Sequence, residues 1–306
     1  MKPLSLLHSL CIIILCLVTD TLHAQGPDFG EPGPIARITT AGASASAGFG
    51  VFTMKDSLIG RVPGGCSLGR TLKAAVGDAV VVSDMGTSMF FTAPHRFGKR
   101  IIERINENPP DVLVAVDFLF WFAYGTIGPD ETNMQTASER MASLDIGLDL
   151  LDTFQGPMIV GDLPNMSDAI GGFISRSQVP TPKVLKALNA KIFAWASERS
   201  RVRIFPLAKL LTQLNSQKPF SIGPHHWETT ELKKVIQRDR LHPTLTGQIA
   251  LIQMVEDILI NDKELAPRAP KMETSLTVLR ARLDPPADVA PKQDEVAPDS
   301  NSYIMN

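Results

Sequence analysis

The chain has 306 residues, of which 44 % are hydrophobic and 20 % are charged, a balance typical of a soluble globular fold. Its formal net charge of −2 gives no electrostatic case for a nucleic-acid partner or for a membrane partner that needs a polybasic segment, and the low share of aromatic residues, 6 %, argues against a platform that stacks on single strands. We therefore expect no nucleic-acid partner.

The first 24 residues have the pattern of a secretory signal peptide. Lys2 supplies a positive charge, and residues 10–18 form an apolar run too short to span a bilayer as a helix. Cleavage is expected after Ala24, which would leave no transmembrane helix and export the protein to the periplasm or the medium. A buried N-terminal helix or an uncleaved anchor is the alternative.

The rest of the chain divides by composition into three parts. Residues 25–34 are rich in Gly and Pro and are predicted to be a linker. Residues 35–262 are long enough for one domain with a sizeable core. Residues 263–306 contain six prolines and many charges, so we expect a disordered tail with one short helix near 272–283. Cys66 is the one cysteine left after cleavage, which excludes an internal disulfide.

Strand-like and helix-like patterns alternate through residues 35–262. Short runs of Val, Ile and Leu predict strands at 35–40, 79–83, 112–118, 157–161 and 201–206. Longer patterns predict helices at 94–107, 132–153, 182–199 and 243–261. This alternation predicts an α/β fold in which helices cover both faces of a parallel sheet of about five strands. Ligands of such sheets bind at the carboxyl ends of the strands.

A turn of small residues leaves the first predicted strand. Residues 37–48, RITTAGASASAG, hold Ser44 and Ser46, each flanked by alanine. Such a turn can expose a serine hydroxyl at the edge where ligands bind, or it can be a close-packed loop. A hydroxyl is a weak nucleophile and needs a base to activate it.

A candidate base lies near the other end of the domain. Asp239 and His242 are three residues apart, just before the last predicted helix, and Pro243 suits the first turn of that helix. This spacing lets the carboxylate accept a hydrogen bond from one imidazole nitrogen while the other nitrogen points elsewhere. The alternative is a helix N-cap at Asp239 beside an incidental histidine.

Taken together, the serine turn and the Asp-x-x-His pair resemble the SGNH (GDSL-type) hydrolase family. The first motif matches as Gly42-Ala43-Ser44, with Ala43 in place of the family's Asp, and the last motif matches at Asp239 and His242, with Pro243 and Gly247 following. The resemblance covers about residues 35–262. It implies a three-layer α/β/α, flavodoxin-like fold and cleavage of carboxylic esters, as in esterases, lipases and carbohydrate deacetylases.

The resemblance also implies roles for single residues. Ser44 would be the nucleophile, His242 the general base and Asp239 the residue that orients it. The backbone N–H groups of Ser44 and Gly86 would form the oxyanion hole. This chemistry needs no cofactor, and its substrate would be a small-molecule or glycan ester.

The third motif of the family, Gly-x-Asn, has no asparagine here. By position Asp117 or Phe120 lies nearest to it. Asp117 is the candidate for the third oxyanion donor, but an ionised carboxylate would oppose the developing negative charge. Asp117 must then be protonated, engaged elsewhere or in another role. The lost Asn and Asp also fit a second hypothesis, a catalytically weak or inactive binding or scaffold protein on the same fold.

Other residues suggest chemistry less strongly. Ser46 lies in a degraded G-x-S-x-G elbow and is the alternative nucleophile. Cys66 lies in a glycine loop with no evident base. His225 and His226 are adjacent, so they cannot both point the same way from a strand, and no further Cys or His completes a metal site. We expect no metal. The rings of residues 117–122, DFLFWF, are expected to be core or to line a pocket.

Overall fold

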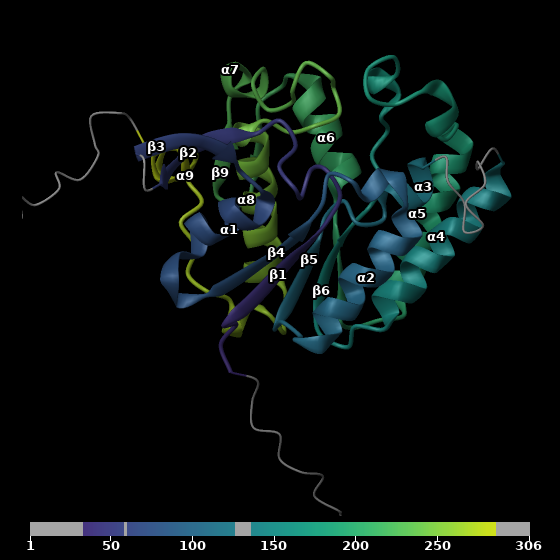
Figure 1. Ribbon diagram of the computed structural model, residues 1–306, viewed down its shortest axis with the longest axis horizontal. Coiled ribbons are helices and arrows are strands. Elements are labelled where there is room, and N and C mark those ends of the chain that lie inside the picture. The colour runs from purple at the N-terminus through teal and green to yellow at the C-terminus, as the bar shows by residue number, and fades with distance from the viewer. Residues whose placement is uncertain (1–32, 58–59, 126–135, 286–306) are drawn as a thin grey trace, which may run out of the picture. The chain divides into compact units, whose positions relative to one another are not determined.

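A parallel sheet of five strands lies at the centre of the computed structural model, which describes residues 33–57, 60–125 and 136–285 (Figure 1). The strands lie in the order β4-β1-β5-β6-β7, with every neighbouring pair parallel. Numbered along the chain this order is 2-1-3-4-5, the flavodoxin-like one. The predicted fold class is therefore confirmed. The strands are β1 (Arg37–Gly42), β4 (Val81–Gly86), β5 (Val112–Ala115), β6 (Met158–Gly161) and β7 (Val202–Phe205).

Helices cover both faces of the sheet (Figure 1). Side chains along β5 point alternately to the two faces of the sheet. Leu113 packs in the cluster of buried residues on one face, and Val112 and Val114 pack in the cluster on the other. This two-sided burial explains why the strand is a continuous apolar run rather than an alternating one. The first face carries α2 (Pro94–Glu107), α3 (Phe120–Tyr124), α4 (Ala137–Asp152) and α5 (Pro182–Ser197), and the second carries α1 (Leu68–Val76) and α8 (Leu245–Asn261).

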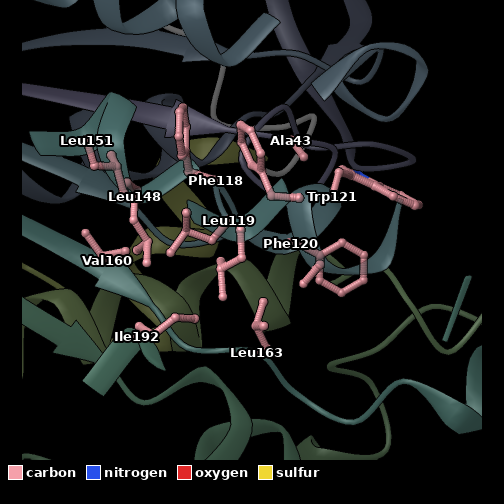
Figure 2. Packing of buried hydrophobic residues seen from close by; sticks show 14 of the residues in the cluster. Ala43, Phe118, Leu119, Phe120, Trp121, Leu148, Leu151, Val160, Leu163 and Ile192 are labelled. Carbon is pink, nitrogen blue, oxygen red and sulfur yellow. The ribbon is translucent and has the colours of Figure 1, made fainter. Parts of the chain in front are cut away.

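The aromatic stretch after β5 belongs mainly to the core. Phe118 and Phe122 are fully buried, and the ring of Phe120 stacks on that of Tyr124 with 4.3 Å between centroids. Figure 2 shows part of this cluster, in which residues 118–121 meet Leu148 and other side chains from α4, α5 and β6. The core expectation for these rings is confirmed, and Phe120 also borders the cavity beside Ser44.

The long predicted helices have bounds close to those in the structure, and the structure also contains short helices and hairpins that the sequence did not predict. Of the prediction at 132–153, residues 132–135 lie outside the described residues. Helix α8 begins at Leu245 rather than at Pro243, because the Thr244 hydroxyl caps it by accepting the Gly247 N–H at 3.3 Å. The elements without a predicted counterpart are α1, α3, α6 (Leu207–Ser216), α7 (Thr229–Leu232), and the hairpins β2 (Phe52–Ser57) with β3 (Gly60–Gly65) and β8 (Phe220–Ile222) with β9 (His225–Trp227).

The expectation of disorder from residue 263 is wrong for residues 263–285, whereas the short helix expected near 272–283 is present. Leu265, Leu279 and Leu283 are buried in this segment, the last two on helix α9 (Leu276–Leu283), which packs against α1 and α8. The Glu273 N–H also donates to the Ala75 carbonyl at 2.9 Å. Burial of these three leucines fixes the segment to the domain despite its prolines and charges, so the domain extends past residue 262. Residues 286–306 of the predicted tail lie outside the described residues.

The predicted signal peptide, 1–24, and most of the predicted linker, 25–34, also lie outside the described residues. Within the part of the chain that is described, no helix combines the length and the apolar character needed to cross a membrane.

Candidate active site

Ser44 lies in a tight turn that leaves the carboxyl end of β1. The turn is a single helical loop in which the Ala47 N–H donates to the Ala43 carbonyl at 2.8 Å and the Phe49 N–H donates to the Ser44 carbonyl at 2.9 Å. It ends at Gly48, whose φ is +71° and where an added Cβ would lie 1.9 Å from the Cys66 carbonyl oxygen. The small residues therefore allow a sharp turn that packs closely against the next segment.

The structure brings Ser44, His242 and Asp239 together. The Ser44 Oγ lies 2.9 Å from His242 Nε2, although the two residues are 198 positions apart. On the other side of the ring, His242 Nδ1 lies 2.7 Å from Asp239 Oδ2. The second oxygen of Asp239 accepts the backbone N–H groups of Leu241 at 2.9 Å and of His242 at 3.0 Å, which fixes the carboxylate. Serine, imidazole and carboxylate thus form one continuous hydrogen-bonded chain.

The hydrogen bonds around Asp239 keep its carboxyl group in the ionised form. Burial by itself would raise the pKa of the Asp239 carboxyl, but hydrogen bonds from the His242 side chain and from the Leu241 and His242 N–H groups outweigh it and hold the pKa below its ordinary value. The ionised carboxylate accepts the Nδ1–H of His242. The lone pair of the ring is then at Nε2, where it accepts the Ser44 hydroxyl proton.

Gln237 joins the two loops that carry Ser44 and His242. Its Nε2 donates to the Phe49 carbonyl at 2.7 Å and to the Pro243 carbonyl at 2.8 Å, while its own N–H donates to the His242 carbonyl at 2.9 Å. The sequence prediction missed this residue. A glutamine that acts through two backbone carbonyls belongs to no motif, so the sequence offers no signal for it.

Asp117 is not an oxyanion donor in this structure, because it accepts every hydrogen bond that it makes. Its Oδ1 accepts the Ala43 N–H at 3.0 Å and the Ser46 hydroxyl at 2.5 Å. Its Oδ2 accepts the N–H groups of Ala45 at 2.8 Å and of Ser46 at 3.2 Å. Burial, with 6 % of the residue exposed, raises the pKa of Asp117, and these hydrogen bonds oppose the rise. The oxyanion prediction is corrected: Asp117 is engaged elsewhere, as the acceptor that holds the turn that carries Ser44.

The predicted role of the Gly86 N–H is also corrected. The next N–H along β4, that of Thr87, donates to the Gly42 carbonyl at 3.0 Å. Successive N–H groups of a strand point to opposite sides, so that of Gly86 points away from β1, where it donates to Asp84 Oδ1 at 3.1 Å. A glycine is still needed at position 86, because an added Cβ would lie 2.7 Å from the Ala47 nitrogen.

The backbone N–H of Ser44 is available as an oxyanion donor. Asp117 accepts the N–H groups on either side of it, at Ala43 and Ala45. The Ser44 N–H itself donates to no group in the described part of the chain. An unpaired N–H beside an accessible serine hydroxyl is the arrangement that can bind a negatively charged oxygen.

The alternative nucleophiles and the histidine pair lie in other settings. Ser46 is fully buried and donates its hydroxyl to Asp117 rather than to an imidazole. Cys66 is also buried, with its Sγ 3.6 Å from the Thr71 hydroxyl. His225 lies 3.1 Å from Glu256 on α8, whereas His226 points to Ser221 on the neighbouring strand. Neither Ser46 nor Cys66 therefore has an imidazole beside it as Ser44 does.

A mainly apolar cavity of about 70 Å³ opens beside Ser44 and His242. Helix α6 forms one wall along roughly two turns, and Asp117 and Phe120 lie on another side. The polar groups of the candidate site thus meet an apolar space large enough for part of a small ligand. Its apolar lining includes Leu207, Leu210, Leu211, Leu214, Met166 and Ile236.

No protein-family model matches the chain, and no curated protein sequence matches it either. Among solved structures it is similar to a gut microbial diltiazem-metabolizing enzyme, with 11 % identity and a TM-score of 0.44; 74 % of this chain is covered, but only 47 % of the enzyme. It is also similar to a protein assigned as a GDSL-like lipase from Parabacteroides merdae, with 11 % identity, a TM-score of 0.46, and 74 % and 95 % of the two chains covered. An acetylxylan esterase from Geobacillus stearothermophilus has 13 % identity, a TM-score of 0.43, and 75 % and 96 % covered. At these values no residue role is transferred from the three proteins to this chain.

Proposed function

We propose that this protein hydrolyses carboxylic esters, with Ser44 as nucleophile, His242 as general base and Asp239 as the residue that orients the imidazole. One observation carries the proposal: the unbroken contact from Ser44 Oγ to His242 Nε2, 2.9 Å, and from His242 Nδ1 to Asp239 Oδ2, 2.7 Å. Three side chains in this order are the arrangement that activates a serine hydroxyl in unrelated hydrolases.

The reaction follows from the geometry. Ser44 Oγ attacks the ester carbonyl carbon while His242 Nε2 takes the hydroxyl proton, and Asp239 stabilises the imidazolium that forms. The Ser44 N–H binds the oxyanion. The carbon–oxygen bond to the alcohol then breaks, His242 returns its proton to the leaving oxygen, and an acyl-enzyme remains. Water, deprotonated by the same imidazole, attacks the acyl carbon; the bond to Ser44 Oγ then breaks, His242 returns the proton to that oxygen, and the acid is released.

The cavity beside Ser44 supports an apolar acyl group. Four leucines of α6 line it together with Met166 and Ile236, so a charged acyl chain would lose its hydration there without gaining partners. Esters of short apolar acids are therefore the expected substrates, whether the alcohol is a small molecule or part of a glycan. We also propose that the protein is exported, on the signal-peptide pattern of residues 1–24.

A serine-reactive fluorophosphonate probe tests the proposal directly. The purified protein should be labelled and should hydrolyse p-nitrophenyl acetate, whereas Ser44→Ala should lose the label and about 10³-fold or more of kcat. Ser46→Ala is the matched control, since it removes the other serine of the same turn and should keep the label. A folded wild-type protein that neither reacts with the probe nor cleaves esters would instead support the binding or scaffold hypothesis. Labelling lost only in Ser46→Ala would move the nucleophile.

A further inference from the structure

Two solvent-exposed phenylalanines flank the imidazole of His242. The Phe49 ring lies 4.6 Å from the His242 ring, measured between centroids, and the Phe173 ring lies 5.6 Å from it. The two phenylalanine rings contact each other edge to face, 5.3 Å apart. Nevertheless Phe49 is 36 % and Phe173 59 % exposed, whereas His242 is only 4 % exposed. The rings thus cover the histidine on one side and present apolar surface to solvent on the other.

The two rings come from different loops that the fold brings to the same place. Phe49 directly follows the turn that carries Ser44, and the hydrogen bond from Gln237 to its carbonyl, 2.7 Å, fixes its backbone. Phe173 follows Gly171, whose φ is +90°, and Gly172, where an added Cβ would lie 3.6 Å from the Asp239 carbonyl oxygen. Each ring is therefore carried by a loop packed against the residues proposed to act on the ester.

The position of the rings relates them to the leaving group. His242 Nε2 must return its proton to the alcohol oxygen, so this oxygen has to come within hydrogen-bond reach of Nε2. Whatever the alcohol carries next to that oxygen then lies close to the rings that flank the imidazole. The acyl group has a separate place, the apolar cavity along α6.

We propose that Phe49 and Phe173 form the subsite for the alcohol part of the substrate, and that this alcohol carries a ring with a flat apolar face. The inference rests on the proposed ester hydrolysis and names its substrate class. Two rings at an interplanar angle of 81° offer one face and one edge to a third ring, which is the geometry that aromatic groups prefer. A linear alkyl chain would gain less from it. Aryl alcohols and sugar rings share this flat face, and the test separates the two.

The test compares acetates of one acid with different alcohols. For the wild type and for Phe173→Ala, kcat/KM is measured with 2-naphthyl acetate, an O-acetylated methyl pyranoside and hexyl acetate. We expect Phe173→Ala to lower kcat/KM about tenfold, mainly through KM, for whichever ring ester is the better substrate, and to change that of hexyl acetate less than twofold. Phe173→Trp should restore the value. Phe193→Ala is the matched control, because Phe193 is 45 % exposed on α5 and has no ring contact with His242.

A binding measurement separates this inference from the proposed function. In the Ser44→Ala variant, 2-naphthol and methyl pyranoside are titrated by calorimetry, and adding Phe173→Ala should raise the Kd of the ring alcohol that binds about tenfold. An equal Kd with and without Phe173, or an equal loss of kcat/KM for all three acetates, would overturn the subsite. Failure of the proposed function would show differently, as a wild type without esterase activity or probe labelling.

Discussion

Removing the Asp117 carboxylate should destabilise the protein by several kcal/mol. In Asp117→Ala, the backbone N–H groups of Ala43, Ala45 and Ser46 lose their acceptor inside a buried turn. An unsatisfied buried donor costs about 1–3 kcal/mol, so three give roughly 3–9 kcal/mol. A water molecule that enters the vacated space would keep the loss near the lower end, about 3–5 kcal/mol.

Asp117→Asn should lower the free energy of unfolding by less than Asp117→Ala, because the amide keeps most of the hydrogen bonds of the carboxylate. If the new amide nitrogen takes the place of Oδ1, only one backbone N–H, that of Ala43, faces a donor, since the Ser46 hydroxyl can rotate to accept. The carbonyl oxygen at the Oδ2 position keeps both of its partners. The expected loss is one unsatisfied donor, about 1–3 kcal/mol. The variant also removes a buried ionisable group, which offsets part of that cost.

Urea unfolding and p-nitrophenyl acetate rates on the same preparations measure both effects. The free energy of unfolding should decrease in the order wild type, Asp117→Asn, Asp117→Ala, and kcat should decrease with it, because the loosened turn carries Ser44. Asp149→Ala on the exposed face of α4 is the control and should stay within about 0.5 kcal/mol of the wild type. Equal stability of all the proteins, together with a faster Asp117→Asn enzyme, would refute this account and place Asp117 in the oxyanion hole.

Three further outcomes are expected. Asp239→Asn should lower kcat on the order of 10⁴-fold, because an amide favours the wrong imidazole tautomer; steady-state rates with unchanged activity would exclude a triad. Gln237→Leu removes the hydrogen bonds to the Phe49 and Pro243 carbonyls that connect the two loops. It should lower kcat on the order of 10–100-fold while fluorophosphonate labelling persists, and an unchanged kcat would show that these hydrogen bonds do not position Ser44 and His242. Burial acts to raise the pKa of Asp152, but hydrogen bonds led by that of Arg199 hold it below its ordinary value. A folded-state pKa below the unfolded-state value, about 3.9, stabilises the folded protein above that value, and this stability is lost as the pH falls through the folded-state pKa. Urea unfolding should therefore show Asp152→Asn less stable than the wild type at pH 7 and losing less stability between about pH 5 and pH 2; parallel losses would refute the assignment.

The parts of the fold that the sequence predicts are those with strong local patterns. The buried strand β5 (Val112–Ala115) lies within the predicted range 112–118, and the helix predicted at 94–107 has the bounds of α2, because each pattern extends over enough residues to be recognised. The missed elements are short, and hairpins such as β2–β3 carry glycine and proline within the strands, which weakens a strand prediction. The end of the domain was misplaced although the short helix near 272–283 was predicted, because Leu279 and Leu283 show that this helix has an apolar side but not that it packs on α1 and α8.

The candidate site divides in the same way between local and long-range information. The contact between Asp239 and His242 follows from their spacing of three residues, and that with Ser44 follows from the parallel topology. The roles of Asp117 and Gly86 do not follow from either. Whether a carboxylate accepts or donates, and to which side an N–H points, depends on groups more than 70 residues away or on the strand pairing. Residue type and position are visible in a sequence, but the direction of a hydrogen bond is not.

The two departures from the SGNH pattern meet in one contact. The chain has Ala43 where the pattern has an aspartate, and Asp117 near the place of its asparagine; in the structure the Asp117 carboxylate accepts the Ala43 N–H at 3.0 Å. Asp117, which follows β5, thus holds the turn that carries Ser44. Gly42 leaves space for its carboxylate, because a Cβ at position 42 would lie 2.0 Å from Asp117 Oδ1. Four hydrogen bonds to this one buried carboxylate stabilise the turn. They hold the turn in which Ser44 Oγ lies 2.9 Å from His242 Nε2, the geometry that the proposed hydrolysis requires. With the Ser44 N–H as its free oxyanion donor, such an enzyme should turn over simple esters slowly, since one missing donor costs about 10²–10³ in kcat.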